Sequence, residues 1–140
     1  MPFQRILVAI DGSEPSNNAL ATAIELAVLA RGKLTALAVE GPLPAYAATV
    51  GEVDEVKREK DAFFRKLAAA ARTTAEYAGV DVEVLVRPGH PAELISRVAE
   101  EGGHDLIVLG HRGHFVRDRV LGSTADRVAE HAPCPVMIVR

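Results

Sequence analysis

The sequence predicts an α/β protein with a doubly wound, five-stranded parallel sheet in strand order 3-2-1-4-5 and helices on both faces. Two features of the pattern favour this fold: apolar runs of strand length alternate with segments of helical apolar spacing, and no segment recurs along the chain. A third feature is length, because 140 residues suffice for one domain with its own core. We therefore expect residues 1–140 to form a single domain.

The chain begins with a predicted strand and helix. Residues 5–10 are apolar from the second residue onward, as expected for a strand covered on both faces of a parallel sheet. Residues 14–31 follow with apolar residues at helical spacing. Ser13 is suited to cap the start of this helix, and Gly32 is expected to end it.

The middle of the chain holds a strand, a loop, a long helix and an edge strand. Residues 34–39 form the second predicted strand, and two prolines open a loop at residues 42–51. Residues 53–78 are predicted to be a helix, whose charge run at residues 57–61 is interpreted as a solvated face. Residues 80–87 form a third strand, with charges typical of a sheet edge. The predicted apolar face of the long helix is Val56, Phe63, Leu67, Ala70, Ala71, Thr74 and Ala78.

The last part of the chain completes the alternation. A short helix is predicted at residues 92–101, a buried strand at residues 106–109, a helix at residues 123–131 and a final strand at residues 136–139. With strand order 3-2-1-4-5, the winding reverses between the first and fourth strands. Asp11 and Gly110 end those two strands, and open α/β sheets bind ligands at this place.

The turn after the fourth strand suggests an anion site. Gly110 and Gly113 allow positive φ and close approach to the backbone, while Ser123 is a good helix N-cap with Asp126 at the third helical position. Amide groups of the turn and of the helix start would hold a phosphate from two sides. The alternative is that the glycines make a tight loop and Ser123 only caps a helix.

Asp11 and Val39 are candidates for the rest of such a ligand. Asp11 would repel a phosphate, so we expect it to face nucleoside hydroxyl or amine donors, or Mg²⁺. Its alternative role is to cap the first helix. Val39 is either an apolar wall for a base or a core residue. Neither the phosphate-loop signature with its lysine nor a glycine triplet after the first strand is present.

Composition narrows the class of protein. Hydrophobic residues at 49% and a net charge of −3 indicate an ordinary soluble domain, neither a nucleic-acid binder nor a membrane protein. The start of the chain has no targeting leader, so we expect a cytoplasmic protein. A single cysteine, Cys134, excludes an intramolecular disulfide and a cysteine zinc site, and it is expected to be a small buried residue.

Several motifs together resemble the universal stress protein family. They are Val8-Ala9-Ile10-Asp11-Gly12-Ser13, Gly89-His90-Pro91, Asp105-Leu106-Ile107-Val108-Leu109-Gly110, Gly122-Ser123 and His131-Ala132-Pro133-Cys134-Pro135-Val136. The resemblance covers the whole chain. It implies a cytoplasmic α/β domain of the Rossmann-like kind, commonly a homodimer active in stress response. In many members a motif of Gly-x-x-Gly, nine residues and Gly-Ser or Gly-Thr binds ATP.

The family's contacts can be carried over to matching positions. The phosphates of ATP would contact Gly110, Gly113, Gly122, Ser123 and Thr124, with Arg112 beside them. Adenine and ribose would contact Ala9, Asp11 and Val39, and Asp11 could reach Mg²⁺ through the nucleotide.

One departure from the motif concerns the loop. Only eight residues, 114–121, separate Gly113 from Gly122. One residue fewer moves a rim of the site by up to about 3.5 Å if the loop is extended. Arg117 and Arg119 in this loop still suit an anion. ATP remains the expected ligand, and the alternative is a dimeric interaction module of the same fold that binds no nucleotide.

Catalysis has little support in the sequence. No serine or cysteine lies at a Gly-x-Ser-x-Gly nucleophile elbow, so we expect slow ATP hydrolysis at most. His111 and His114 have metal-ligand spacing only on a helix, and no third ligand is evident, so no metal centre is expected.

The last strand is expected to mediate pairing. An apolar strand at a sheet edge has free N–H and C=O groups that can pair with a second copy. We therefore expect a homodimer through Val136, Met137, Ile138 and Val139.

Overall fold

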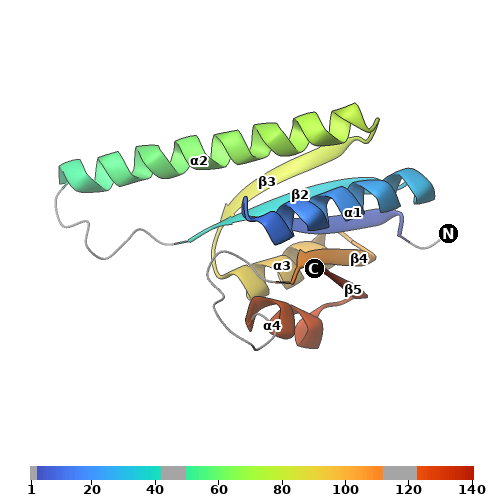
Figure 1. The fold of residues 1–140 in the computed structure, drawn as a ribbon. Helices are drawn as coiled ribbons and strands as arrows, with labels where there is room; N and C mark the ends of the chain where they lie inside the picture. Colours follow the sequence, from blue (N-terminus) through green and yellow to red (C-terminus); the bar gives the residue numbers. More distant parts are fainter. Residues whose placement is uncertain (1–2, 42–49, 112–122) are drawn as a thin grey trace.

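In the computed structural model, which describes residues 3–41, 50–111 and 123–140, strands and helices alternate along the chain (Figure 1). Among these residues, five parallel strands pair in the order β3-β2-β1-β4-β5, which confirms the predicted fold and strand order. The strands are β1 (Arg5–Ile10), β2 (Lys33–Glu40), β3 (Val82–Pro88), β4 (Leu106–Gly110) and β5 (Val136–Val139). The helices are α1 (Glu14–Ala30), α2 (Val50–Tyr77), α3 (Pro91–Glu101) and α4 (Ser123–His131).

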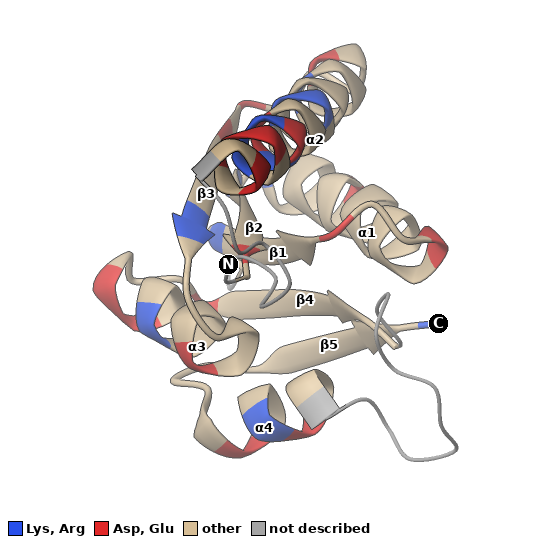
Figure 2. Cartoon of the chain, turned by 90° about the vertical axis from the view of Figure 1, so that its left-hand side faces the viewer, with Lys and Arg blue, Asp and Glu red and all other residues tan. Residues whose placement is uncertain are grey.

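Two apolar cores lie on opposite faces of the sheet. Helices α1 and α2 cover one face, where Ile6 and Val8 are fully buried. Helices α3 and α4 cover the other, where Leu7 and Ile107 are fully buried (Figure 2). Successive side chains of a strand point to opposite faces, so a central strand with both faces covered is apolar throughout. This explains the continuous apolar runs in the sequence.

The end of α1 differs slightly from the expected one. The helix ends at Ala30, and Arg31 takes the left-handed conformation with φ of 53°. Gly32 follows, and a Cβ there would lie 2.6 Å from the carbonyl oxygen of Phe3. Glycine is therefore required at position 32 by the close approach of the N-terminal segment.

Helix α2 buries a face that overlaps the predicted one only in part, since Leu67 and Ala71 lie inward as predicted and Phe63 does not. Phe64 and Leu67 pack against the first core, whereas Phe63, expected inside, is 46% exposed. Four consecutive alanines at residues 68–71 offer apolar surface on every side, so the larger side chains decide the orientation of the helix. The exposed residues of the predicted face are Ala70, Thr74 and Ala78, and the buried alanines are Ala68, Ala71 and Ala75.

The charged first half of α2 is solvated, as predicted. Lys57, Arg58, Glu59 and Asp61 are exposed, and Figure 2 shows charges of both signs along this helix. Lys60 is half-buried, and its Nζ donates to the carbonyl oxygen of Gly41. Although α2 is 28 residues long, no helix in the described ranges is apolar enough to cross a membrane.

Strand β3 lies at one edge of the sheet, as its charges predicted. It begins at Val82, two residues later than expected, because Val80 is buried in the connection from α2 and its amide donates to the carbonyl oxygen of Ala75. Strand β5 is the opposite edge.

Asp105 connects the starts of β1 and β4 at the amino end of the sheet. Its two carboxylate oxygens accept hydrogen bonds from the amides of Gln4, at 2.8 Å, and Arg5, at 3.0 Å. These bonds join the start of β1 to the start of β4. This motif residue therefore has a structural role, at the end of the sheet opposite to Asp11.

His104 is buried beside this junction. Its Nε2 lies 3.0 Å from Oγ1 of Thr35, and Nδ1 has no hydrogen-bond partner among the described residues. Burial, and then the nearby Arg5 guanidinium, lower the pKa of His104 below its ordinary value of 6.5, while the backbone carbonyls of Ala99 and Val98 and the carboxylate of Asp105 oppose the shift. The folded protein therefore holds this imidazole neutral at neutral pH.

We expect His104 to make the fold sensitive to acid. Below pH 6.5 the unfolded chain binds a proton at this position that the folded chain does not yet bind, so the free energy of unfolding falls as the pH falls toward the lowered folded-state pKa. Urea unfolding at pH ~7.5 and ~5.5 should show a smaller loss of the free energy of unfolding in His104→Gln than in the parent chain. The exposed His90→Gln is the control, and an equal loss in all three proteins would contradict the expectation.

Candidate functional site

The candidate site lies where β1 and β4 pair side by side and the strand order reverses. Asp11 follows β1 at the carboxyl edge of the sheet, and Gly110 ends β4 at the same edge. After β1 the chain continues into α1 on one face, whereas α4 covers the other face. The structure therefore brings the two odd turns of the sequence together at the switch point.

Asp11 organises the turn that starts α1. Its Oδ1 accepts hydrogen bonds from the amide of Ser13 at 2.8 Å and from Oγ of Ser13 at 2.5 Å. Ser13 is the N-cap of α1, and its Oγ accepts from the amide of Ser16 at 3.3 Å. Asp11 thus supports the cap from two residues earlier in the chain.

Ser16 completes this turn, and the sequence reasoning did not place it in the site. It is buried, and its Oγ accepts a hydrogen bond from the amide of Asp11 at 2.9 Å. The spacing Asp-x-Ser-x-x-Ser is the signal that would have revealed it. Because these groups bond to one another, the donors at the start of α1 are largely occupied. An anion at this edge would have to depend on the β4 side.

Gly110 is a glycine for one of the two predicted reasons, close approach to its backbone, and not for the other. It does not have positive φ. A Cβ at this position would lie 2.7 Å from the carbonyl carbon of Pro15 and 2.9 Å from the amide nitrogen of Ser16. Close approach to the Gly110 backbone was predicted, and the group that approaches is the first turn of α1. Glycine here lets α1 pack against the end of β4.

Ala9 and Val39 lie near the same edge on the face covered by α3 and α4. Both are half-buried and pack against the second core. Their positions near the ends of neighbouring strands β1 and β2 make them adjacent parts of one apolar surface. This arrangement accommodates both interpretations of Val39, as a core residue and as a wall for a flat apolar group.

Helix α4 begins at Ser123, as predicted, and the residues of its first turn include the half-exposed Thr124 and Asp126. A helix start presents unpaired amide groups and a partial positive charge, which favour an anion. The other phosphate-binding candidates, Arg112, Gly113 and Gly122, lie outside the described residues, as does His114.

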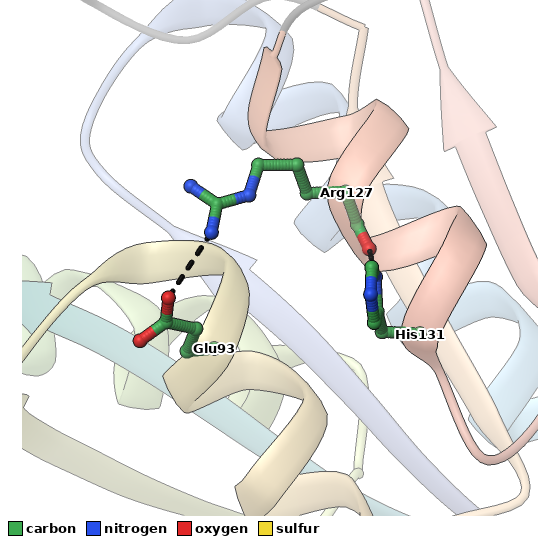
Figure 3. A network of polar contacts seen from close by, with 3 residues as sticks. All are labelled: Glu93, Arg127 and His131. Atoms are coloured by element: carbon green, nitrogen blue, oxygen red, sulfur yellow. Dashed lines mark hydrogen bonds and ion pairs between the residues drawn. The ribbon is translucent and has the colours of Figure 1, made fainter.

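Helices α3 and α4 are joined by an exposed ion pair. Arg127 of α4 donates from Nη2 to Oε1 of Glu93 in the first turn of α3, at 3.0 Å (Figure 3). His131 lies one turn further along, with Nδ1 3.0 Å from the carbonyl oxygen of Arg127. Because both partners of the ion pair are more than half exposed, we expect it to contribute at most about 1 kcal/mol. The pair connects α4 to the first turn of α3.

No cluster of three or more His, Cys, Asp or Glu side chains suited to a metal ion occurs in the parts of the chain that are described. His90 is exposed at the start of α3, where its side chain makes no capping bond. Cys134 is half-buried, less than expected, and burial raises the pKa of its thiol.

Comparison with known proteins adds to this geometry. The chain matches the model of the universal stress protein family over residues 2–140. It is 36% identical to universal stress protein YxiE of Bacillus subtilis, over 99% of each chain. It resembles the structure of universal stress protein UspA from Lactobacillus plantarum, with a TM-score of 0.85, 28% identity, and coverage of 100% of this chain and 99% of the other. A universal stress protein in complex with cAMP matches with a TM-score of 0.78, 28% identity and the same coverage.

Proposed function

Because this chain belongs to the universal stress protein family, we propose that it is a cytoplasmic stress-response protein that binds an adenine nucleotide between the carboxyl ends of β1 and β4. ATP is the proposed ligand, with Mg²⁺ reached through the nucleotide. The observation that carries the proposal is the meeting of the Asp11 turn and the end of β4 at the switch point of the sheet. The related protein in complex with cAMP supports an adenine nucleotide as the class of ligand.

We assign the phosphates, the ribose and the adenine of the ligand to different parts of the site. The start of α1 uses its donors in its own cap, so the phosphates are assigned to the β4 side and to the start of α4. Asp11 is assigned to the ribose hydroxyls, because a carboxylate accepts hydrogen bonds from hydroxyl groups and repels phosphate. The adenine is assigned to Ala9 and Val39. The proposed phosphate contacts are Gly110, Arg112, Gly113, Gly122, Ser123 and Thr124.

The experiment is to identify and measure the ligand. The purified protein is denatured and the released small molecules are analysed by mass spectrometry, and ligand-free protein is titrated calorimetrically with ATP, with and without Mg²⁺, and with AMP and cAMP. An adenine nucleotide at close to one per chain, or saturable heat with one of the three, supports the proposal. Failure of all of them to bind would overturn it and favour the interaction module that binds no nucleotide.

We also propose that the protein acts as a homodimer through β5. The carbonyl oxygens of Pro135 and Val139 accept hydrogen bonds from β4, so the polar backbone groups of the intervening Val136 and Ile138 point away from it. All four side chains of β5 are half-exposed. An apolar edge strand with free backbone groups can pair with the same strand of a second copy.

Ile138→Pro is expected to convert such a dimer to monomer. Proline removes the outward N–H of residue 138, which does not pair with β4, and proline is tolerated at this kind of edge position. Sedimentation at micromolar concentration measures the mass, and circular dichroism checks the fold. Ile138→Val keeps the N–H and should stay dimeric. A parent chain that is already monomeric would contradict the dimer, and a Pro variant that stays dimeric would move the interface elsewhere.

A further inference from the structure

An exposed aromatic ring of α2 covers the turn that carries Asp11. Phe63 is 46% exposed, yet a Cβ placed on Gly12 would lie 3.6 Å from its Cζ and 3.9 Å from its Cε1. Leu67, one turn along α2, lies 3.8 Å from the same point. These are ordinary van der Waals distances, so Phe63 and Leu67 occupy the space directly beside Gly12.

Phe63 is held in this position by its neighbour. The rings of Phe63 and Phe64 are 5.1 Å apart and meet edge to face, at 83°. Phe64 packs against the first core, and so anchors the pair to the body of the protein. The ring beside Gly12 is therefore connected to the first core through Phe64.

The turn that carries Asp11 has no side chain at Gly12, its middle residue. Gly12 has φ of 84°, a conformation that favours glycine, and it has no side chain with which to pack. Hydrogen bonds from Ser13 to Asp11 hold the polar part of the turn. On the side toward α2, the side chains of Phe63 and Leu67 line the space beside Gly12.

We propose that Phe63 is a positioning residue of the site: by filling the space beside Gly12 it holds the Asp11–Ser13 turn in the conformation that presents the Asp11 carboxylate to a ligand. The ligand part of this inference rests on the proposed function. Long α2, whose first half is charged and solvated, thereby becomes part of the site. By reciprocity, a nucleotide that tightens the turn also tightens α2 at Phe63.

The test compares three variants of the full chain. Phe63→Ala removes the ring, Phe63→Leu restores apolar bulk over Gly12, and Tyr77→Ala removes a 95% exposed ring at the other end of α2. Amide exchange of Ser13, followed by NMR without nucleotide, reports the turn itself, since this amide donates to Asp11. Calorimetric titration with ATP reports binding, and urea unfolding reports global stability.

We expect Phe63→Ala to speed the exchange of the Ser13 amide and to raise the Kd for ATP by about fivefold or more. Phe63→Leu should recover both, and Tyr77→Ala should leave both unchanged. Unchanged Ser13 exchange in Phe63→Ala, or faster exchange with an unchanged Kd, would overturn the inference. The inference would also be overturned if the loss of global stability measured in urea accounts for the whole change in Ser13 exchange. If the parent chain binds no nucleotide, the proposed function fails, while Ser13 exchange still decides whether Phe63 holds the turn.

Discussion

Gly110→Ala is expected to destabilise the protein by about 1–3 kcal/mol, the usual cost of overpacking. The new methyl group would lie 2.7 Å from the carbonyl carbon of Pro15, 2.8 Å from its oxygen and 2.9 Å from the amide nitrogen of Ser16. All three are backbone atoms in the first turn of α1, so no flexible side chain can swing aside. The capping bonds of Ser13 further resist movement of this turn.

Gly51→Ala is the matched control for this change. Gly51 lies in α2, and a Cβ there meets nothing within 4 Å. Alanine at this position should leave stability unchanged or raise it by up to about 1 kcal/mol, because alanine favours the helix. Urea unfolding with a constant m value measures both variants. Equal midpoints for Gly110→Ala and the parent chain would show that α1 can shift without cost, and that β4 does not need glycine for packing.

Asp11→Asn is expected to weaken nucleotide binding by about tenfold or more, because a hydrogen bond to a charged acceptor exceeds one to a neutral acceptor by about 1–2 kcal/mol. The fold should change little. Asparagine keeps an Oδ1 that can accept from the amide and Oγ of Ser13, so the turn that starts α1 is retained. The substitution therefore separates the ligand role of Asp11 from its structural role.

Asp11→Ala is the companion variant, since it removes both roles. It should lose nucleotide affinity and also about 1 kcal/mol of stability, as when a helix cap is removed. Calorimetry gives the Kd and urea unfolding gives the free energy of unfolding. Full affinity in Asp11→Asn with lower affinity in Asp11→Ala would mean that Asp11 acts only through the turn. The assignment of its charge to the ribose would then be wrong.

The prediction of the fold depended on local sequence patterns, and the structure confirms the strands and helices that these patterns predicted. The apolar runs of β1 and β4 arise because both faces of these strands are covered, and the helical spacing in α3 arises because only one side of that helix is buried. Each of these patterns can be read from its own segment alone. The strand order followed from short right-handed connections, which leave few topologies for so short a chain. The placement of Asp11 and Gly110 at one edge then needed no further information.

Predictions that depended on contacts between distant segments were less complete. The alanine-rich part of α2 has no distinct apolar side, so its sequence does not indicate how the helix is oriented. The packing of Phe64 and Leu67 against the first core determines that orientation. His104 and Thr35 are 69 residues apart in the sequence, and nothing local indicates their hydrogen bond. The contact of Phe63 with Gly12 is of the same kind.

By itself the sequence determined the α/β class, the strand order and the edge of the sheet where the candidate residues gather, because hydrophobic periodicity and turn residues are local properties. Only the tertiary structure decided what those residues do there. It showed that Gly110 accommodates the first turn of α1 and that Asp11 accepts a hydrogen bond from Ser13, the cap of that helix. It also showed that Phe63 lies beside Gly12, in the turn between Asp11 and Ser13. The roles of Gly110 and Phe63 depend on distances between atoms of segments far apart in the sequence, which exist only once the chain has packed.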